Sequence, residues 1–408
     1  MNTVSKGPEF VVARAEGAWL WDEHGDRYLD GTASLWYCNV GHGRTEIADA
    51  VHKQITTLDA YTVYGDFANG PALELSARLA SHAPVADPRV ILTCGGGESI
   101  ETASKLARRY WAALGSPSKT HLISRTGGYH GLHGFGTSMG MDRFRAGFGP
   151  LIEQTSVVPH DSVEALEQEI QRVGPENVAA FFAEPVIGAG GVYAPEPDYF
   201  TRVAELCRGY GVLFIVDSVI CAFGRMGDWF GVERFGVSPD MIVFAKGVTS
   251  GYLPLGGVIT SGEIADPFWN HPGNPFIHGT TYAGHPTCCA AALANLDILE
   301  REDLFTASLE VEAHLDVSLR TLEDHPLVRE VRSGVGVMAA VELTEKALME
   351  HGITTDEVFQ EARARGVVLR AIPTALLMSP PLIVSWQQID HMTSTLRSAL
   401  DAVAARHL

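Results

Sequence analysis

Three charged residues in the middle of the chain each directly follow a run of apolar residues. Glu184 follows VAAFFA, Asp217 follows VLFIV, and Lys246 follows MIVFA. Runs this short and this rich in Val, Ile and Phe are typical of buried strands in a parallel sheet. A solvated strand end explains any one of these residues but explains three in succession poorly. Because ligands bind beyond the carboxyl ends of parallel strands, we expect all three side chains to open onto one edge.

Two glycine-rich segments point to the same edge. The segment ILTCGGGESIETASKLARRYW predicts a strand, then Gly95–Gly97, then an amphipathic helix. The apolar face of that helix would carry Ile100, Ala103, Leu106, Ala107 and Tyr110. Glycines let the backbone approach a ligand closely, and a helix N-terminus offers free N–H groups, so we expect a phosphate there. The segment is neither G-x-G-x-x-G nor a Walker A loop, which disfavours dinucleotide and nucleoside triphosphate binding. In the second segment, GGYHG follows the strand THLIS and brings Tyr129 and His130 to the rim.

Together these residues match the needs of pyridoxal phosphate. Lys246 would form a Schiff base with the cofactor's aldehyde and then act as general base and acid on the substrate. Asp217 would keep the ring nitrogen protonated, so that the ring withdraws electrons from a carbanion at the substrate's Cα. Tyr129 would stack on the ring, and Gly96 and Gly97 would hold the phosphate. Desolvation and the cofactor's positive charge would favour the neutral amine that this lysine needs.

The sequence resembles the class III aminotransferases among the fold-type I pyridoxal-phosphate enzymes, in particular the omega-amino acid and amine–pyruvate branch. The resemblance runs from about Trp19 to the last helix. It rests on the segments LDGTASLWYCNVGHGR, GGGESIETASKLARRY, GGYHG, AEPVIGAGG, IVDSVICAFGRMG, FAKGVTSGYLPLGG, HGTTYAGHP and SPPLIV. It implies a transaminase that moves an amino group from an amine or omega-amino acid to a keto acid, with pyruvate preferred.

The resemblance also implies roles that the spacing does not reveal. Val219 matches the aliphatic residue on the second face of the cofactor ring. Thr281 matches a threonine that reaches the phosphate of the neighbouring subunit, so a homodimer, or a dimer of dimers, is implied. Trp36 and Tyr64 resemble aromatic residues of the substrate pocket, Tyr64 from the partner chain. Arg370 resembles a mobile arginine that pairs with the carboxylate of the keto acid, for which a bidentate guanidinium is suited.

The sequence departs from the family's pattern around the cofactor. The family usually has serines in its phosphate loop, whereas all three residues are glycine here, so at least one hydroxyl donor is missing. The family's Asp-Glu pair is Asp217-Ser218 in this chain, which removes a carboxylate. Neither change removes a group that the bond chemistry needs. They suggest a divergent member with unusual affinity for substrate or cofactor.

Three hypotheses of function remain open from the sequence. In a transaminase, Glu184, Tyr129 and Arg370 would orient the substrates, and Lys246 would carry the proton shift. A racemase, aminomutase or decarboxylase of the same fold would use the same cofactor, because the sequence does not show which substrate bond stands perpendicular to the ring. A catalytically weak binding or regulatory protein is the third hypothesis, and the retained Lys246, Asp217, Tyr129 and Thr281 argue against it.

The composition narrows the class of protein. Thirty basic and 49 acidic residues give a formal net charge of −19, which disfavours nucleic acid or an anionic membrane as partner. Six cysteines without a C-x-x-C pair suggest buried thiols in a reducing compartment. His130 and His133 lack an evident third ligand, so no metal site is expected. The first 17 residues show no signal peptide, and we expect a soluble, cytoplasmic protein.

The order of the predicted elements indicates an α/β protein. We expect a fold-type I architecture, with a mostly parallel central sheet, helices on both faces and a smaller α+β domain. Residues 1–50 would form an N-terminal segment that packs with the small domain. Residues 51–295 would form the large cofactor-binding domain, and residues 296–408 the small domain. A hairpin is predicted in WLWDEHGDRYLDG. An amphipathic helix is predicted in TEIADAVHKQI, with an apolar stripe of Ile47, Ala50, Val51 and Ile55.

Overall fold

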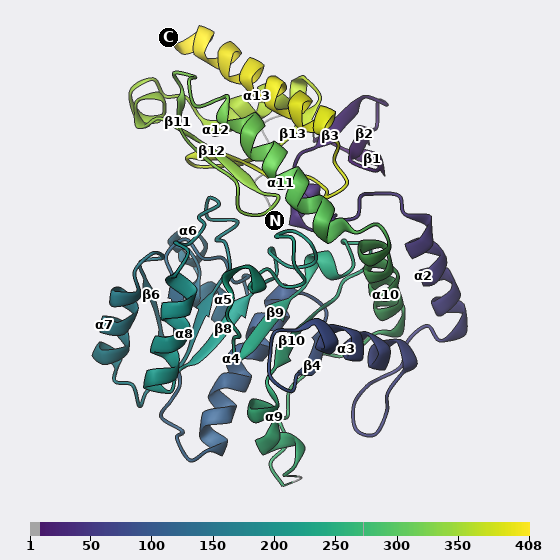
Figure 1. The fold of residues 1–408 in the computed structure, drawn as a ribbon, viewed down its shortest axis with the longest axis vertical. Coiled ribbons are helices and arrows are strands. Elements are labelled where there is room, and N and C mark those ends of the chain that lie inside the picture. Colours follow the sequence, from purple (N-terminus) through teal and green to yellow (C-terminus); the bar gives the residue numbers. More distant parts are fainter. Residues whose placement is uncertain (1–8, 272) are drawn as a thin grey trace. The chain divides into compact units, whose positions relative to one another are not determined.

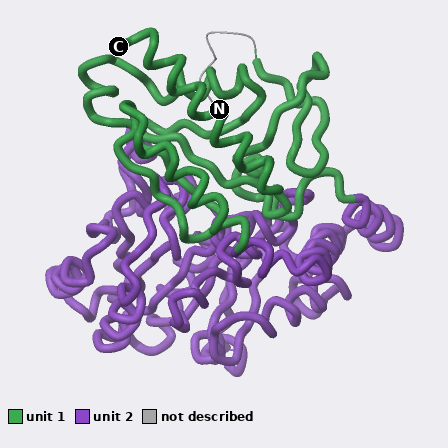
Figure 2. Tube along the Cα trace, turned by 45° about the horizontal axis from the view of Figure 1, so that its top comes forward, with its two compact units in different colours: residues 1–44, 310–408 green, residues 45–309 purple. Residues whose placement is uncertain are grey.

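The computed structural model describes residues 9–271 and 273–408 (Figure 1). These residues form two compact units, which we call unit 1 (residues 1–44 and 310–408) and unit 2 (residues 45–309; Figure 2). The domain boundaries expected after residues 50 and 295 stay a prediction. The first eight residues, on which the expected lack of a signal peptide partly depends, lie outside the described residues.

The described part of unit 2 is built around a seven-stranded sheet in the order β4-β10-β9-β8-β7-β5-β6. The strands are β4 (Arg89–Thr93), β5 (His121–Arg125), β6 (Thr155–Val158), β7 (Val178–Ala183), β8 (Leu213–Asp217), β9 (Met241–Phe244) and β10 (Gly256–Thr260). Strands β5 to β9 pair in parallel, and β10 lies antiparallel to both of its neighbours. The expected mostly parallel sheet is confirmed, but β6 and β10 were not predicted.

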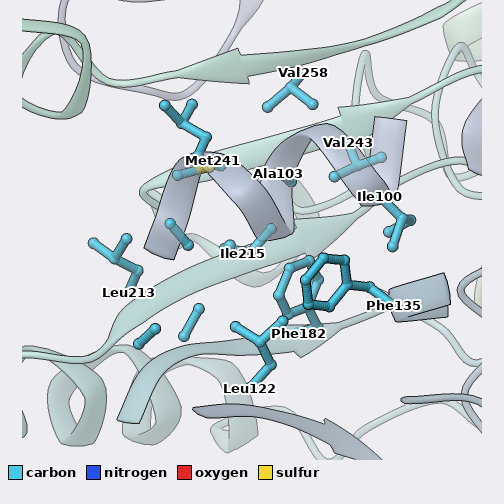
Figure 3. Packing of buried hydrophobic residues seen from close by; sticks show 14 of the residues in the cluster. Ile100, Ala103, Leu122, Phe135, Phe182, Leu213, Ile215, Met241, Val243 and Val258 are labelled. Carbon is cyan, nitrogen blue, oxygen red and sulfur yellow. The ribbon is translucent and has the colours of Figure 1, made fainter. Parts of the chain in front are cut away.

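Helices cover both faces of this sheet because alternate residues of a strand point to opposite sides. On one face α4 (Gly96–Ala113) packs against Phe182, Ile215 and Val243 (Figure 3). On the other face the ring of Phe214 stacks on Phe181, with ring centroids 6.4 Å apart, and on Phe200 of α8 (Tyr199–Tyr210), with ring centroids 5.8 Å apart. The predicted apolar face of α4 is buried as expected: Ile100, Ala103, Leu106, Ala107 and Tyr110.

The remaining helices of unit 2 surround this core. They are α2 (Thr45–Thr57), α3 (Gly70–His82), α5 (Gly134–Met139), α6 (Asp142–Arg145), α7 (Val163–Val173), α8 (Tyr199–Tyr210), α9 (Gly262–Trp269) and α10 (Pro286–Arg301). Helix α2 was predicted to bury a stripe that included Ile47 and Ile55. Ile47 is buried, but Ile55 is 51% exposed, because α2 packs on α10 and not on the sheet. The prediction was wrong for Ile55.

Unit 1 has, within its described residues, two four-stranded sheets. The first contains β1 (Val12–Glu16), β2 (Trp19–Asp22), β3 (Arg27–Asp30) and β13 (Val367–Val368). Strands β2 and β3 form the predicted hairpin, and β3 pairs in parallel with β13. The second contains β11 (Val328–Arg332), β12 (Ala339–Leu343), β15 (Ala375–Met378) and β14 (Arg370–Ile372).

Helices complete unit 1. Besides the short turn α1 (Ala33–Trp36), it contains α12 (Thr355–Ala364) and α13 (Trp386–His407), and α11 (Leu304–Arg320) spans the boundary between the units. Capping boxes begin α12 at Thr354 and α13 at Ser385, each satisfying two backbone N–H groups at the helix start. Across residues 9–271 and 273–408, no helix is long and apolar enough to cross a membrane.

Candidate active site

A cavity of about 140 Å³ in unit 2 opens where β7, β8 and β9 end. Because these strands are neighbours in the sheet, Glu184, Asp217 and Lys246 meet at one edge, as the sequence predicted. The cavity is lined by Gly96, Gly97, Ile100, Tyr129, His130, Gly131, Glu184, Asp217, Val219, Ile220 and Lys246. Ile100, Gly131 and Ile220 were not predicted as site residues, although Gly131 and Ile220 directly follow residues that were.

Asp217 is held in place by two hydrogen bonds. Its Oδ2 atom lies 2.8 Å from Nδ1 of His130, and its Oδ1 accepts a hydrogen bond of 3.1 Å from the backbone N–H of Val219. Both His130 and Asp217 are buried, at 1% and 3% exposed. An ionised Asp217 requires the proton of the imidazole to lie on Nδ1, so His130 donates to the carboxylate. His130 therefore contacts Asp217, a relationship that sequence spacing did not reveal.

Glu184 holds the loop that carries Tyr129. Its two carboxylate oxygens accept hydrogen bonds from the backbone N–H groups of Tyr129, at 3.0 Å, and Gly188, at 3.1 Å. The guanidinium of Arg125 donates to the Glu184 backbone oxygen. Burial raises the pKa of the Glu184 carboxyl, opposed by the nearby His130. The carboxyl thus lines the cavity and also fixes the position of the predicted stacking residue.

Lys246 adopts an unusual backbone conformation just after β9. Its φ of 50° lies in the left-handed region, which costs a residue with a Cβ about 1–3 kcal/mol when the surroundings hold it there. The side chain is half-buried and lines the cavity. Such strain is common where a fold must direct a functional side chain, and here it directs the lysine toward the cavity.

At the start of α4, Gly96 and Gly97 leave little room for side chains, whereas a Cβ at Gly95 would meet open space. A Cβ at Gly96 would lie 3.1 Å from Cγ1 of Val219, closer than ordinary packing allows. Helix α4 has Gly95 as its N-cap without a side-chain cap, so its first N–H groups face the open end of the helix. A small anion fits at this helix start, which we call the glycine cradle (residues 95–97).

The lining residues fit pyridoxal phosphate. The glycine cradle suits the phosphate, Asp217 offers a buried carboxylate, and Lys246 offers an amine. Nε2 of His130 is buried and has no hydrogen-bond partner among the described residues, as expected of a polar site next to a ligand. Across those residues, no group of three His, Cys, Asp or Glu side chains could hold a metal ion.

Four predicted residues lie elsewhere. Thr281 and Tyr64 line a second cavity of about 440 Å³ in unit 2, and the Tyr64 hydroxyl donates a hydrogen bond of 3.0 Å to the backbone oxygen of Thr280. Trp36 and Arg370 belong to unit 1, where Trp36 is buried and Arg370 begins β14. The cavity at the ends of β7, β8 and β9 does not include these four residues, and their substrate or phosphate roles stay predictions.

Known proteins share this fold and sequence along nearly the whole chain. A putrescine–pyruvate aminotransferase of Pseudomonas aeruginosa is 38% identical, over 97% of this chain and 91% of the relative. A thermostable (S)-enantioselective omega-transaminase from Thermomicrobium roseum is 40% identical with a TM-score of 0.93, over 98% of this chain and 93% of the other. An amine transaminase from an uncultivated Pseudomonas species was solved with pyridoxal phosphate bound. It is 35% identical with a TM-score of 0.92, over 98% of this chain and 97% of the other.

A family comparison agrees with these pairwise similarities. The model of the aminotransferase class III family matches residues 2–400, which include every residue that lines the cavity. The central sheet, the smaller second unit and the lysine at the end of β9 are what the resemblance in the sequence led us to expect. This chain is a member of the class III aminotransferases, which depend on pyridoxal phosphate.

Proposed function

We propose that this pyridoxal-phosphate-dependent aminotransferase moves an amino group from a primary amine or omega-amino acid to pyruvate. The observation that carries the proposal is the cavity that joins Lys246, Asp217 and Tyr129 to the glycine cradle. The names of similar proteins favour this choice of substrates, since they include a putrescine–pyruvate aminotransferase and an omega-amino acid–pyruvate aminotransferase. Apolar and aromatic residues proposed for the substrate pocket suit an apolar or extended donor.

The residues of the cavity divide the chemistry between them. When bound, pyridoxal phosphate supplies an electron-withdrawing ring that stabilises negative charge on the substrate carbon that loses its proton. Lys246 would hold the cofactor through Nζ and, once the substrate amine has displaced it, would remove and return that proton. Asp217 would keep the ring nitrogen protonated, with its carboxylate oriented by His130. Tyr129 and Val219 would hold the ring from its two faces.

The substrate side of the proposal uses residues outside this cavity. Arg370 would pair with the carboxylate of the keto acid, because a guanidinium binds a planar carboxylate through two parallel hydrogen bonds. Trp36 and Tyr64 would supply aromatic walls. Glu184 would act mainly through Tyr129, because its carboxylate accepts a hydrogen bond from the backbone N–H of Tyr129.

We further propose a homodimer in which Thr281 reaches the phosphate of the partner's site. Tyr61, Tyr64, Phe67, Leu73 and Tyr282 are all large apolar residues, between 45% and 66% exposed. The rings of Tyr61 and Phe67 are in contact, and Tyr61, Tyr64 and Tyr282 line the same cavity as Thr281. A cluster of this kind is typical of a surface that another chain covers.

We also propose that the protein works in the reducing cytoplasm. The six cysteines form no disulfide bond within the described residues, which is usual for proteins of that compartment.

The visible absorbance of the purified protein tests this function directly. The bound cofactor's band should disappear when an amine donor is added without keto acid, and pyruvate should restore it. Replacing pyruvate with 2-oxoglutarate identifies the preferred acceptor. A band that shifts with an amino acid but never disappears would instead favour a racemase or decarboxylase. A protein that shows no band even after incubation with pyridoxal phosphate would contradict the proposal.

A further inference from the structure

We propose that Asn295, on α10, is a positioning residue that holds Lys246 in the orientation needed for its bond with the cofactor. The proposal rests on the function proposed above, in which Lys246 holds the cofactor through Nζ. Asn295 lies in the interior of a helix and does not line the cavity at the strand ends. Its support comes from the contacts that its side-chain amide makes with the turn directly after the lysine.

The amide of Asn295 joins α10 to the turn that carries Lys246. Its Nδ2 atom donates a hydrogen bond of 2.9 Å to the backbone oxygen of Gly247 and one of 3.0 Å to that of Val248. These two residues directly follow Lys246, and the three together form the turn η2 (Lys246–Val248). An amide NH2 group has two N–H donors, so one side chain satisfies both oxygens. The turn is therefore held by a residue of a distant element.

The turn needs such support because its backbone is strained. Lys246 has a φ of 50° and Ser250 a φ of 49°, both in the left-handed region that is unfavourable for residues with a Cβ. The backbone N–H groups of Val248, Thr249 and Ser250 donate to the oxygens three residues before them over 3.2–3.3 Å, at the long end of the usual range. Because rotation about φ moves the Cβ relative to the preceding strand, a relaxed turn would direct the lysine away from the cavity.

The surroundings of Asn295 indicate that its amide serves the turn and not the helix. The residue is 0% exposed, and its neighbours on the buried face of α10 are apolar: Ala291, Ala292, Ile298 and Leu299. Asparagine is a weaker helix former than alanine or leucine, and a buried amide is costly unless it is hydrogen-bonded. Among the described residues Oδ1 has no hydrogen-bond partner, so the bonds of Nδ2 offset this cost. The opposite orientation of the amide would place Oδ1 against two backbone oxygens.

Binding of two forms of the cofactor to the apoprotein tests the proposal without any measurement of turnover. Pyridoxal phosphate has the aldehyde that reacts with Lys246, whereas pyridoxamine phosphate has an amine in its place and forms no bond with a lysine. Asn295→Leu keeps the branched shape of the side chain but removes both N–H donors. We expect this variant to bind pyridoxal phosphate about fivefold to hundredfold more weakly, the loss expected for two hydrogen bonds. It should bind pyridoxamine phosphate as the wild type does.

Asn177→Leu is the matched control. The amide of Asn177 also donates to a backbone oxygen, that of Val173 at 3.0 Å, but Asn177 directly precedes β7 and so lies at the end of that strand opposite the cavity. This variant should bind both compounds as the wild type does.

Asn295→Asp tests the donors themselves. A protonated aspartic acid keeps one O–H donor, whereas an ionised one brings only acceptors to two backbone oxygens. The affinity of this variant for pyridoxal phosphate, relative to that of the wild type at the same pH, should therefore be higher at about pH 6 than at about pH 9. If Asn295→Leu does not fold, this variant decides, and a relative affinity that does not change with pH would overturn the proposal.

Two results with a folded Asn295→Leu variant would also overturn the proposal. One is an unchanged affinity for pyridoxal phosphate. The other is an equal loss of affinity for both compounds, since a general disturbance of the structure weakens both. A wild type that binds neither compound would instead overturn the function on which the proposal rests.

Discussion

Nδ1 of His130 lies 2.8 Å from Oδ2 of Asp217, and both side chains are buried at the carboxyl end of β8. The two residues are far apart in the sequence, and the fold joins them because β5 and β8 both lie beside β7 in the sheet. A buried carboxylate needs such a donor, since an unpaired charge is costly in a protein interior. The pair therefore sets the orientation of the carboxylate that would face the cofactor.

Replacing His130 by Phe should lower kcat by about tenfold to hundredfold, because Asp217 loses one of its two oriented donors. The absorbance maximum of the bound cofactor should shift, since its ring nitrogen would meet a differently placed carboxylate. His121→Phe is the control: this partly buried histidine bonds to Ser156 at the opposite end of β5. Steady-state kinetics and visible spectra of the two variants check the prediction, and an unchanged spectrum and kcat for His130→Phe would contradict it.

Lys246→Ala should remove the covalent attachment of the cofactor. It should also lower the rate of amino transfer by about a hundredfold to ten-thousandfold, the range expected for the loss of a general base. Treatment with borohydride followed by mass spectrometry measures the attachment. Lys105→Ala, at an exposed lysine of α4, should behave as the wild type does. Cofactor mass still added to the Lys246→Ala variant would show that another residue holds it.

Mixed dimers should reveal that Thr281 serves the partner's site. A Thr281→Ala homodimer should bind pyridoxal phosphate about tenfold to hundredfold more weakly, the cost of a hydrogen bond to a charged group. A dimer of one Thr281→Ala chain and one Lys246→Ala chain keeps one complete site, if Thr281 crosses the interface. Differently tagged chains, purified as the mixed dimer, should then recover about half of the wild-type activity. The absence of any recovery would mean that Thr281 acts within its own chain.

Glu233 should make the stability of the protein depend on pH. Burial raises the pKa of this carboxyl to about 7, although both of its oxygens accept hydrogen bonds from the backbone N–H of Phe230. Between the unfolded pKa near 4.5 and the folded pKa near 7, the folded state keeps a proton that the unfolded state has lost. The free energy of unfolding therefore falls as the pH rises through this window.

Glu233→Gln should remove this dependence. Between pH 5 and pH 8, the free energy of unfolding of the variant should rise by about 2 kcal/mol relative to that of the wild type, since one pKa unit corresponds to about 1.4 kcal/mol. Melting temperatures of both proteins at the two pH values measure the gain. A difference between the two proteins that is the same at pH 5 and pH 8 would show that Glu233 is ionised in the folded protein at both.

Much of the sheet and its functional edge was predictable because the signals were local. The runs before Glu184, Asp217 and Lys246 are apolar on both faces of the sheet, and each charged residue comes at a strand end. The apolar face of α4 follows from the helical period alone. These features depend on a few consecutive residues, which is the range over which a sequence pattern carries information.

The rest depended on contacts between distant segments. Strand β10 begins with two glycines and runs opposite to its neighbours, so neither its composition nor its direction matched the pattern of the other strands. The spacing of residues could not show that His130 meets Asp217, because this contact depends on β5 and β8 both lying beside β7 in the sheet. The exposure of Ile55 likewise depends on which neighbour α2 finds, and that neighbour, α10, lies far along the chain.

Strand β4 leaves the ribosome before the other strands of its sheet, yet its neighbour in that sheet is β10, residues 256–260. Strand β10 in turn pairs with β9, which ends just before Lys246. Strand β4 therefore has no partner in its sheet until residue 260 has been synthesised. A nascent chain that stops earlier already contains the lysine, the aspartate and the glycines, but the strand that leads into the glycines is still unpaired. We therefore expect capture of the cofactor to be a late event in the biosynthesis of this protein, set by the position of one antiparallel strand.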